Sequence, residues 1–117
     1  MYPEKKSIDD KAMFDDIVNA ILSVMGDDAV KIILYGSVAR GDNTWESDVD
    51  IAVLTTRHYD WKARNELYDS LWEYDLKYDT LFSIVPIESY KFFQCKNDIP
   101  LYMNIEKEGI TLWKKYA

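Results

Sequence analysis

The first apolar pattern of the chain predicts an amphipathic helix. Ser7 and Asp10 have the spacing of a capping box at a helix start, and Gly26 is a typical residue at a helix end. Between these signals, apolar residues recur with the 3.6-residue period of an α-helix and therefore share one face. These residues are Phe14, Ile17, Val18, Ile21, Leu22 and Met25.

Three later segments have the pattern of β-strands. Residues 30–35 are short, β-branched and nearly all apolar, as expected for a buried strand that stops at Gly36. Residues 48–54 alternate, with their acidic positions on one side of the strand. Residues 79–85 predict a third strand that ends at Pro86. The chain therefore contains at least a small sheet.

Helices are expected between and after these strands. Residues 60–77 predict a second long helix, and its aromatic residues are interpreted as core. Residues 88–94 predict a short helix, and residues 101–113 a further one that Gly109 weakens. The stripe expected to face the core in the second long helix consists of Leu67, Tyr68, Leu71, Trp72 and Leu76, with Trp61 also assigned to the core.

The order of these elements predicts the fold class. We expect an α/β or α+β fold: a small mixed β-sheet with helices packed on one face. The 117 residues suit one domain, spanning residues 1–117, because a chain of this length buries enough surface for one core. No apolar stretch is long enough to span a membrane, and the first ten residues lack the apolar segment of a signal peptide.

The charge balance and the single cysteine narrow the functional classes. The chain has 14 basic and 21 acidic residues, a formal charge of −7. Nucleic-acid binding is therefore not expected, because neutralising phosphates requires an excess of Lys and Arg. Cys95 is the only cysteine, which excludes an internal disulfide and favours the cytoplasm as the location.

The segment Gly36–Gly41 (GSVARG) has the features of a phosphate-binding turn. A buried strand ends at Gly36, where the missing side chain allows the backbone to approach a ligand closely. A short helix then begins near Ser37, and its free N–H groups point toward the same place. A P-loop is excluded, because Asp42 and Asn43 stand where that motif has its Lys and its Ser or Thr.

Asp48 and Asp50 predict a metal site next to this turn. Side chains two positions apart on a strand point to the same face, so the two carboxylates repel each other unless a cation lies between them. Carboxylates are preferred ligands of Mg²⁺. Either motif alone is usually a simple turn or a solvated strand start. Together they indicate a nucleoside triphosphate site with two-metal chemistry.

The stretch GSVARGDNTWESDVD resembles the Gly-Ser-x₁₀-Asp-x-Asp signature of nucleotidyltransferases of the DNA polymerase β superfamily. The compact chain is similar to the minimal nucleotidyltransferases of prokaryotes, the MNT proteins that pair with HEPN-domain partners. The C-terminal NIEKEGITLW is similar to the end of such domains. The resemblance implies a polymerase β-like nucleotidyltransferase fold and transfer of NMP from an NTP to a hydroxyl group, with release of pyrophosphate.

The resemblance also assigns roles to matching residues. Gly36 and Ser37 match the phosphate-binding pair, and Asp48 and Asp50 match the paired metal ligands of the catalytic site. Many relatives carry a basic residue directly after the Gly-Ser pair, where this chain has Val38. One contact to the triphosphate is therefore absent.

Further site residues are expected with alternatives left open. The family has a third carboxylate on a later strand, and Asp79 is the expected metal ligand and catalytic residue, with Asp75 as the alternative. Arg40 is expected either to contact phosphate or to form a structural ion pair. Ser47 either contacts the nucleotide or caps a turn. Trp45 either stacks on a base, docks a partner or anchors its own loop.

Three functional hypotheses follow. The first is an Mg²⁺-dependent enzyme that transfers AMP from ATP to a tyrosine of a HEPN toxin and thereby acts as an antitoxin. The second is a non-catalytic antitoxin that acts by contact. The third is a small-molecule nucleotidyltransferase whose acceptor site is completed by a second subunit in an oligomer. The acidic surface suggests that the acceptor is a basic protein.

Overall fold

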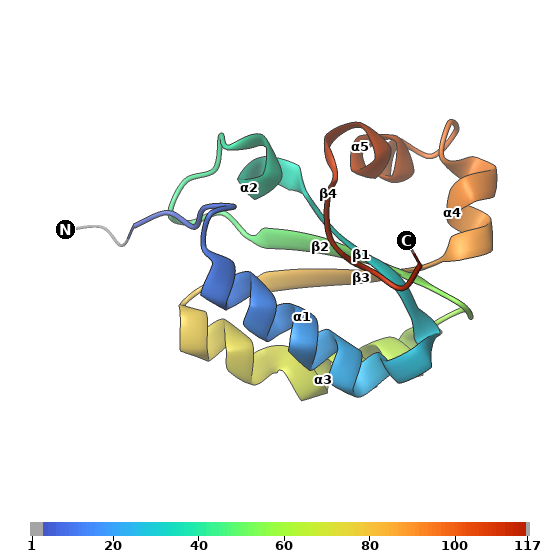
Figure 1. The fold of residues 1–117 in the computed structure, drawn as a ribbon, viewed down its shortest axis with the longest axis horizontal. Helices are drawn as coiled ribbons and strands as arrows, with labels where there is room; N and C mark the ends of the chain where they lie inside the picture. Colours follow the sequence, from blue (N-terminus) through green and yellow to red (C-terminus); the bar gives the residue numbers. More distant parts are fainter. Residues whose placement is uncertain (1–3, 117) are drawn as a thin grey trace.

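A computed structural model describes residues 4–116 as a four-stranded sheet with helices on both faces (Figure 1). The first half of the chain forms a helix, a strand, the short helix that was expected after Gly36 and a second strand. The second half adds a long helix, a strand, two short helices and a last strand. The elements are α1 (Lys11–Met25), a 3₁₀ turn (Gly26–Asp28), β1 (Ala29–Tyr35), α2 (Gly36–Arg40), β2 (Val49–Thr55), α3 (Trp61–Tyr78), β3 (Phe82–Glu88), α4 (Ser89–Cys95), α5 (Pro100–Glu108) and β4 (Ile110–Lys114).

The sheet is mixed and has the strand order β3-β2-β1-β4. Strand β2 is parallel to β3, and the helix α3 makes the crossover that a parallel pair requires. Strand β1 is antiparallel to both of its neighbours, β2 and β4. Strands β1 and β2 are therefore central, whereas β3 and β4 form the edges.

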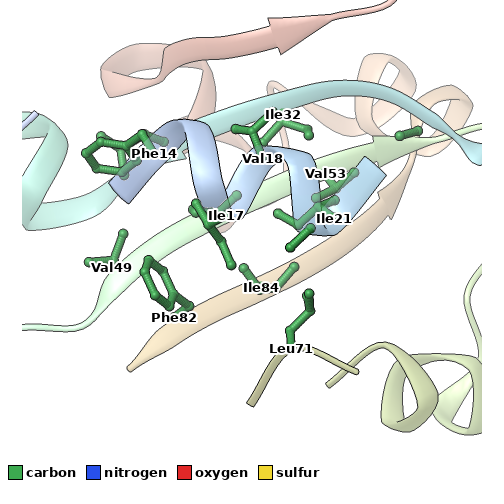
Figure 2. Close-up of a cluster of buried hydrophobic side chains, with 14 of the residues drawn as sticks. Phe14, Ile17, Val18, Ile21, Ile32, Val49, Val53, Leu71, Phe82 and Ile84 are labelled. Carbon is green, nitrogen blue, oxygen red and sulfur yellow. The ribbon is translucent and has the colours of Figure 1, made fainter. Parts of the chain in front are cut away.

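Helices α1 and α3 cover one face of the sheet (Figure 1). Helix α1 packs its apolar stripe onto the side chains of β1, β2 and β3, as the 3.6-residue pattern predicted. Figure 2 shows this core between α1, the sheet and Leu71 of α3. Its labelled residues are Phe14, Ile17, Val18, Ile21, Ile32, Val49, Val53, Leu71, Phe82 and Ile84.

Helices α4 and α5 cover the opposite face, so the expectation that helices pack on one face only is wrong (Figure 1). The reason lies in the central strands, which carry apolar side chains on both sides. Ile33 of β1 and Leu54 of β2 point to this second face, where Phe92 of α4 and Ile105 of α5 bury them. The mixed sheet with packed helices is confirmed.

Helix α1 begins without the predicted capping box. Asp10 is its N-cap residue, but no side chain caps the first turn. The Ser7 hydroxyl instead accepts a hydrogen bond from the backbone N–H of Asp9. The other predicted helix signal is confirmed, because Gly26 ends the helix in a conformation with positive φ.

The third strand and the C-terminal segment differ from the expectation. Strand β3 begins at Phe82 and continues through Pro86 to Glu88. A proline is tolerated there because β3 is an edge strand and needs no donor on its outer side. The predicted helix over residues 101–113 is wrong in its second half, since α5 ends at Glu108 and β4 follows. Gly109 separates the two elements.

Helix α3 buries only part of the stripe that was expected to face the core. Leu67 and Leu71 are buried, but Tyr68, Trp72 and Leu76 are exposed to solvent. Trp61, also expected in the core, is 75% exposed. Neither α3 nor any other helix within residues 4–116 is long and apolar enough to cross a membrane.

Candidate active site

The turn after β1 brings the backbone of Gly36 against the side chain of Asp50. Gly36 has φ 79°, a left-handed conformation that L residues with a side chain rarely adopt. A Cβ atom at this position would overlap Oδ2 of Asp50. Glycine is therefore required both by the backbone angle and by the close approach of the carboxylate.

Helix α2 extends this turn and is closed by Gly41. Its first residues, Gly36 and Ser37, carry N–H groups without partners inside the helix. The Ser37 side chain is half-buried and forms no hydrogen bond to any residue of the described range 4–116. Gly41 has φ 83° and donates its N–H to the carbonyl of Ser37. The predicted strand–turn–short helix is thus confirmed as a structure.

Asp50 lies inside the central strand β2, and Asp48 directly precedes that strand. Asp50 pairs with Tyr35 of β1 on one side and with Ser83 of β3 on the other. Asp50 is half-buried, whereas Asp48 is exposed. The pKa of the Asp50 carboxyl is raised, first by burial and second by the negative charge of Asp48.

The two carboxylates fit a Mg²⁺ site in their chemistry. A raised pKa means that the negative charge on Asp50 is poorly balanced by the protein, and a cation between Asp48 and Asp50 would supply that balance. Mg²⁺ is commonly held by one or two carboxylates, with waters and substrate phosphates as the other ligands. Within residues 4–116, however, no three His, Cys, Asp or Glu side chains are grouped so that they could hold one metal ion.

Glu108 is the site residue that the sequence did not reveal. It is the last residue of α5, and its side chain is only 17% exposed. Its Oε1 accepts a hydrogen bond of 2.9 Å from the N–H of Gly36, and both of its oxygens accept from Nη1 of Arg40, at 3.1 and 3.0 Å. The similarity of NIEKEGITLW to the end of family domains drew attention to this segment. It did not indicate which of the charged side chains in the segment points toward the site.

Arg40 forms a structural ion pair with acidic residues outside the Asp48–Asp50 pair. Its Nε lies 3.1 Å from Oδ2 of Asp42, and its Nη1 lies 3.0 Å from Oε2 of Glu108. The ion-pair alternative for Arg40 is therefore the one that the structure contains. The positive charge of Arg40 also offsets part of the rise in the pKa of Asp50.

Ser47 closes a turn in the loop before β2. Its hydroxyl accepts a hydrogen bond of 2.9 Å from the N–H of Thr44, and its own N–H donates to the carbonyl of Thr44. These contacts match the turn-capping alternative. A contact between Ser47 and nucleotide stays a prediction.

Asp79 lies beyond the C-terminus of α3 and not on a strand, so the expected position at the start of β3 is wrong. It has φ 49° and ψ 50°, ends α3 and is exposed. The β3 residue directly beside Asp50 is Ser83. Asp79 does line a cavity of about 310 Å³ together with Asp48 and Trp45. Its role as a third carboxylate, and the role of Trp45, stay predictions.

Asp75, the alternative third carboxylate, has a structural contact. Its Oδ1 accepts a hydrogen bond of 2.9 Å from the N–H of Phe82. This bond joins the last turn of α3 to the first residue of β3. Asp75 therefore shapes the connection between these two elements.

Tyr35 is a buried phenol at the end of β1 near this carboxylate group. Burial and, second to it, the negative charges of Asp50 and Glu108 together raise the pKa of Tyr35 to about 12. Its hydroxyl consequently stays protonated at neutral pH.

Comparison with known sequences places most of the chain in one family model. The model described as Polymerase beta, Nucleotidyltransferase matches residues 19–116. A candidate protein adenylyltransferase of Methanocaldococcus jannaschii is 34% identical over 98 residues, which cover 84% of this chain and 92% of the relative. A second candidate protein adenylyltransferase of that organism is 38% identical over 63 residues, 54% of this chain and 64% of the relative.

Comparison with solved structures confirms the predicted fold. The complex of the tri-AMPylated Shewanella oneidensis HEPN toxin with MNT antitoxin contains a similar chain, with TM-score 0.60 and 22% identity over 90% of this chain and 72% of that chain. A crystal structure of a toxin-antitoxin with AMP-PNP contains another, with TM-score 0.57 and 28% identity over 83% and 73% of the two chains. A candidate nucleotidyltransferase from Sulfolobus solfataricus has TM-score 0.57 and 17% identity, over 90% and 80%.

Proposed function

Because the chain belongs to the polymerase beta nucleotidyltransferase family, we propose that it transfers AMP from ATP to a hydroxyl group of a partner protein. The observation that carries this proposal is the contact between the Gly36 turn and Asp50, which joins the Gly-Ser turn to the Asp48–Asp50 pair in one site. The choice of AMP and of a protein acceptor is supported by the relative that is a candidate protein adenylyltransferase. It is further supported by the 28% identity to a chain in a toxin-antitoxin structure with AMP-PNP.

The residues divide the work as follows. Asp48 and Asp50 would hold Mg²⁺, which supplies charge neutralisation and polarisation of the α-phosphate when it is bound. The N–H of Gly36 is already occupied by Glu108, so the donors left for the triphosphate are the Ser37 hydroxyl and the next N–H groups of α2. Gly36 itself provides space, because any side chain there would displace Asp50.

The transfer exchanges one bond at the α-phosphorus of ATP for another. The acceptor oxygen forms a bond to the α-phosphorus of ATP, and the bond from that phosphorus to the bridging oxygen breaks, so pyrophosphate leaves. The hydroxyl proton goes to a base, and we assign this role to Asp79, which lines the same cavity as Asp48. AMP stays on the acceptor through a phosphodiester bond.

The acceptor that we propose is a tyrosine of a HEPN toxin in the cytoplasm. The support is the MNT antitoxin and HEPN toxin complex among the structures of the same fold. The formal charge of −7 would favour encounter with a basic partner. Transfer to its tyrosine would add a negative phosphodiester and thereby change the surface of the toxin.

Transfer can be tested with α-labelled ATP, Mg²⁺ and a candidate HEPN toxin, chosen as the product of a gene next to the one for this chain. We expect a labelled toxin band with the wild-type protein, no label after chelation with EDTA, and no label with Asp48→Asn or Asp50→Asn. The matched control is Asp98→Asn, which removes an exposed carboxylate in the connection between α4 and α5. Mass spectrometry then locates AMP on the toxin.

Each alternative function predicts another result. A non-catalytic antitoxin would bind the toxin without labelling it, and a small-molecule transferase would label a product that does not migrate with protein. The enzymatic proposal fails if the wild-type protein labels nothing and binds no Mg-ATP in calorimetry. It also fails if both Asn variants label the toxin as well as the wild-type protein does.

A further inference from the structure

Helix α3 carries a second apolar stripe that faces solvent. Tyr68, Trp72 and Leu76 follow one another at helical spacing, and their exposed fractions are 40%, 58% and 72%. Leu81, just after the helix, is 53% exposed. The core-facing stripe of the same helix is formed by Leu67 and Leu71. Exposed apolar side chains that gather on one face of a helix are typical of a protein–protein contact.

A groove of about 480 Å³ runs between this stripe and the edge strand β3. Apolar side chains on its walls include Tyr68, Trp72 and Leu81. Among the residues of the described range that line it, the charged ones are Asp69 and Asp75, and none is Lys or Arg. A partner with apolar side chains between basic ones would therefore match the groove both in polarity and in charge.

The backbone edge of β3 is blocked near both of its ends, which disfavours an added strand. The N–H of Phe82 donates to Oδ1 of Asp75. Pro86 has no N–H, and its carbonyl accepts from Nη2 of Arg64. The N–H of Val49 bonds to the carbonyl of Leu81, so the alternation of a parallel ladder turns the backbone groups of Ile84 toward the outer side of β3. The outward backbone groups of Ile84 thus lie between the two blocked positions, Phe82 and Pro86. Blocked edges of this kind resist pairing with another strand.

We propose that α3 and the edge of β3 form the docking surface for an amphipathic helix of the acceptor protein, with Lys or Arg beside its apolar stripe. A helix satisfies its own backbone and needs only the apolar groove and the carboxylates Asp69 and Asp75. A second copy of this chain fits less well, because each copy brings a formal charge of −7 and carboxylates to the contact.

The groove lies at the edge of the sheet, one strand away from Asp50. Ser83 lines the groove and is the β3 partner of Asp50 in the sheet. Strand β3 therefore stands between the groove and Asp50, at the ordinary separation of about 4.8 Å between adjacent strands. The identity of the docked helix as part of the acceptor rests on the proposed function, whereas the docking surface itself does not.

The surface can be tested with a synthetic probe. A fluorescein-labelled peptide of about 15 residues, with leucine at i, i+3, i+4 and i+7 and lysine elsewhere, serves as the basic helix. We expect fluorescence anisotropy to show binding that Trp72→Ala and Asp69→Lys each weaken by about tenfold or more. The matched control is Phe93→Ala on α4, because Phe93 has the same exposed fraction as Trp72, 58%. This control should bind as the wild-type protein does.

Three results would overturn the docking surface. Equal binding of a peptide with glutamate in place of lysine would remove the charge argument. Tighter binding of an extended lysine–valine peptide than of the helical one would show an added strand instead. A wild-type dimer in sedimentation that Trp72→Ala dissociates would assign the surface to a second copy. Circular dichroism and urea unfolding verify that each variant is folded.

The two proposals fail separately. Asp50→Asn should bind the helical peptide normally while it loses AMP transfer, and Trp72→Ala should bind Mg-ATP normally while it loses the peptide. If the wild-type protein binds the peptide but transfers no AMP to the toxin, the docking surface is supported and the proposed enzymatic function is contradicted. Labelling of a toxin by Trp72→Ala at the wild-type rate would remove the surface as an acceptor site.

Discussion

The carboxylate of Glu108 accepts a hydrogen bond of 2.9 Å from the backbone N–H of Gly36, although 72 positions of sequence separate the two residues. The same carboxylate pairs with Arg40 at the other end of α2. One side chain at the end of α5 therefore braces the turn and the short helix that the triphosphate is proposed to contact. The donor in this contact is a backbone N–H, which every residue except proline carries, so the sequence does not indicate the contact.

Removal of this brace should reduce both stability and ATP affinity. We expect Glu108→Ala to lower the free energy of unfolding by about 1–3 kcal/mol, because Gly36 loses its acceptor and Arg40 loses a partner. Glu108→Gln keeps an acceptor for Gly36 and should lose less. The measurement is urea unfolding, with calorimetry of Mg-ATP binding. Glu106→Ala, which removes an exposed ion pair with Lys96, should change stability by less than about 1 kcal/mol.

Gly36→Ala should cost more than Gly41→Ala, although both glycines have a left-handed conformation. Their φ angles are 79° and 83°, so an added Cβ is strained to a similar extent, about 1–2 kcal/mol, at either position. Space separates the two: a Cβ at Gly36 overlaps the Asp50 carboxylate, and a Cβ at Gly41 meets nothing within 4 Å. We expect Gly36→Ala alone to abolish AMP transfer. Equal losses of activity would contradict the steric role of Gly36.

Asp79 and Asp75 should separate into a functional and a structural residue. Asp79→Asn should abolish AMP transfer and leave unfolding unchanged, if its place in the cavity with Asp48 reflects a catalytic role. Asp75→Ala should lower the free energy of unfolding by about 1–2 kcal/mol, because the N–H of Phe82 loses its acceptor. Urea unfolding and the labelling assay, applied to both variants, measure these effects. Full activity of Asp79→Asn would exclude Asp79 as the third carboxylate.

The free energy of unfolding should decrease at acidic pH because Asp28 becomes protonated. Its carboxylate accepts hydrogen bonds from Tyr59 and Arg57, both at 2.9 Å, and the Tyr59 bond is the larger cause of its lowered pKa. A carboxyl with a lowered pKa in the folded state contributes stability above its unfolded pKa of about 3.9, and this contribution is lost as the pH falls through the folded pKa. The urea concentration at the midpoint of unfolding should therefore decrease as the pH falls below about 5. The decrease should be less steep in Asp28→Asn and in Tyr59→Phe. Both variants should retain part of the pH dependence, because hydrogen bonds from Lys77 and Tyr78 also lower the pKa of Asp16.

Leu71→Ala and Trp72→Ala should have opposite profiles, although the residues are neighbours. Leu71 is 4% exposed and belongs to the core, so its truncation should cost about 2–5 kcal/mol. Trp72 is exposed, so its truncation should cost less than about 1 kcal/mol and yet remove peptide binding. Urea unfolding and anisotropy on both variants give the comparison. A large loss of stability in Trp72→Ala would show that its side chain supports the fold.

The sequence was sufficient for local structure wherever one physical signal dominated. The period of α1, the apolar run of β1 and the alternation before Leu54 each specify one element, and the structure contains all three. The Gly-Ser turn followed by a short helix was predicted in the same way, since Gly36 and Gly41 mark its two ends. The same period predicts that Asp48 and Asp50 share a face, but Asp48 lies just before β2, and their joint role in a metal site stays a prediction.

Helix α3 shows where a periodic pattern is ambiguous. It carries apolar residues on two stripes, and periodicity alone does not tell which stripe faces the sheet. Leu67 and Leu71 face it, and Tyr68, Trp72 and Leu76 do not. Which side of α3 faces the sheet depends on how the helix crosses from β2 to the parallel strand β3, and this geometry is set by the pairing of strands and not by the sequence of the helix.

The remaining differences have long-range causes. Strand β4 is only five residues long, and its pairing with β1 joins segments that are far apart in the chain. Pro86 suggested a strand end, but β3 continues because its outer side has no strand partner. Glu108 acts through a bond to a backbone N–H, a contact that no spacing of residue types encodes.

The placement of Asp50 inside β2, with Asp48 just before it, gives the two carboxylates different freedom of motion. Backbone groups in a central strand open to solvent only when much of the domain unfolds, whereas exposed loop positions fluctuate on the nanosecond to microsecond scale. We expect amide hydrogen exchange to be slow at Asp50 and fast at Asp48. In the proposed site, one carboxylate would thus define a fixed point, and the other would adjust as a triphosphate arrives and a pyrophosphate departs.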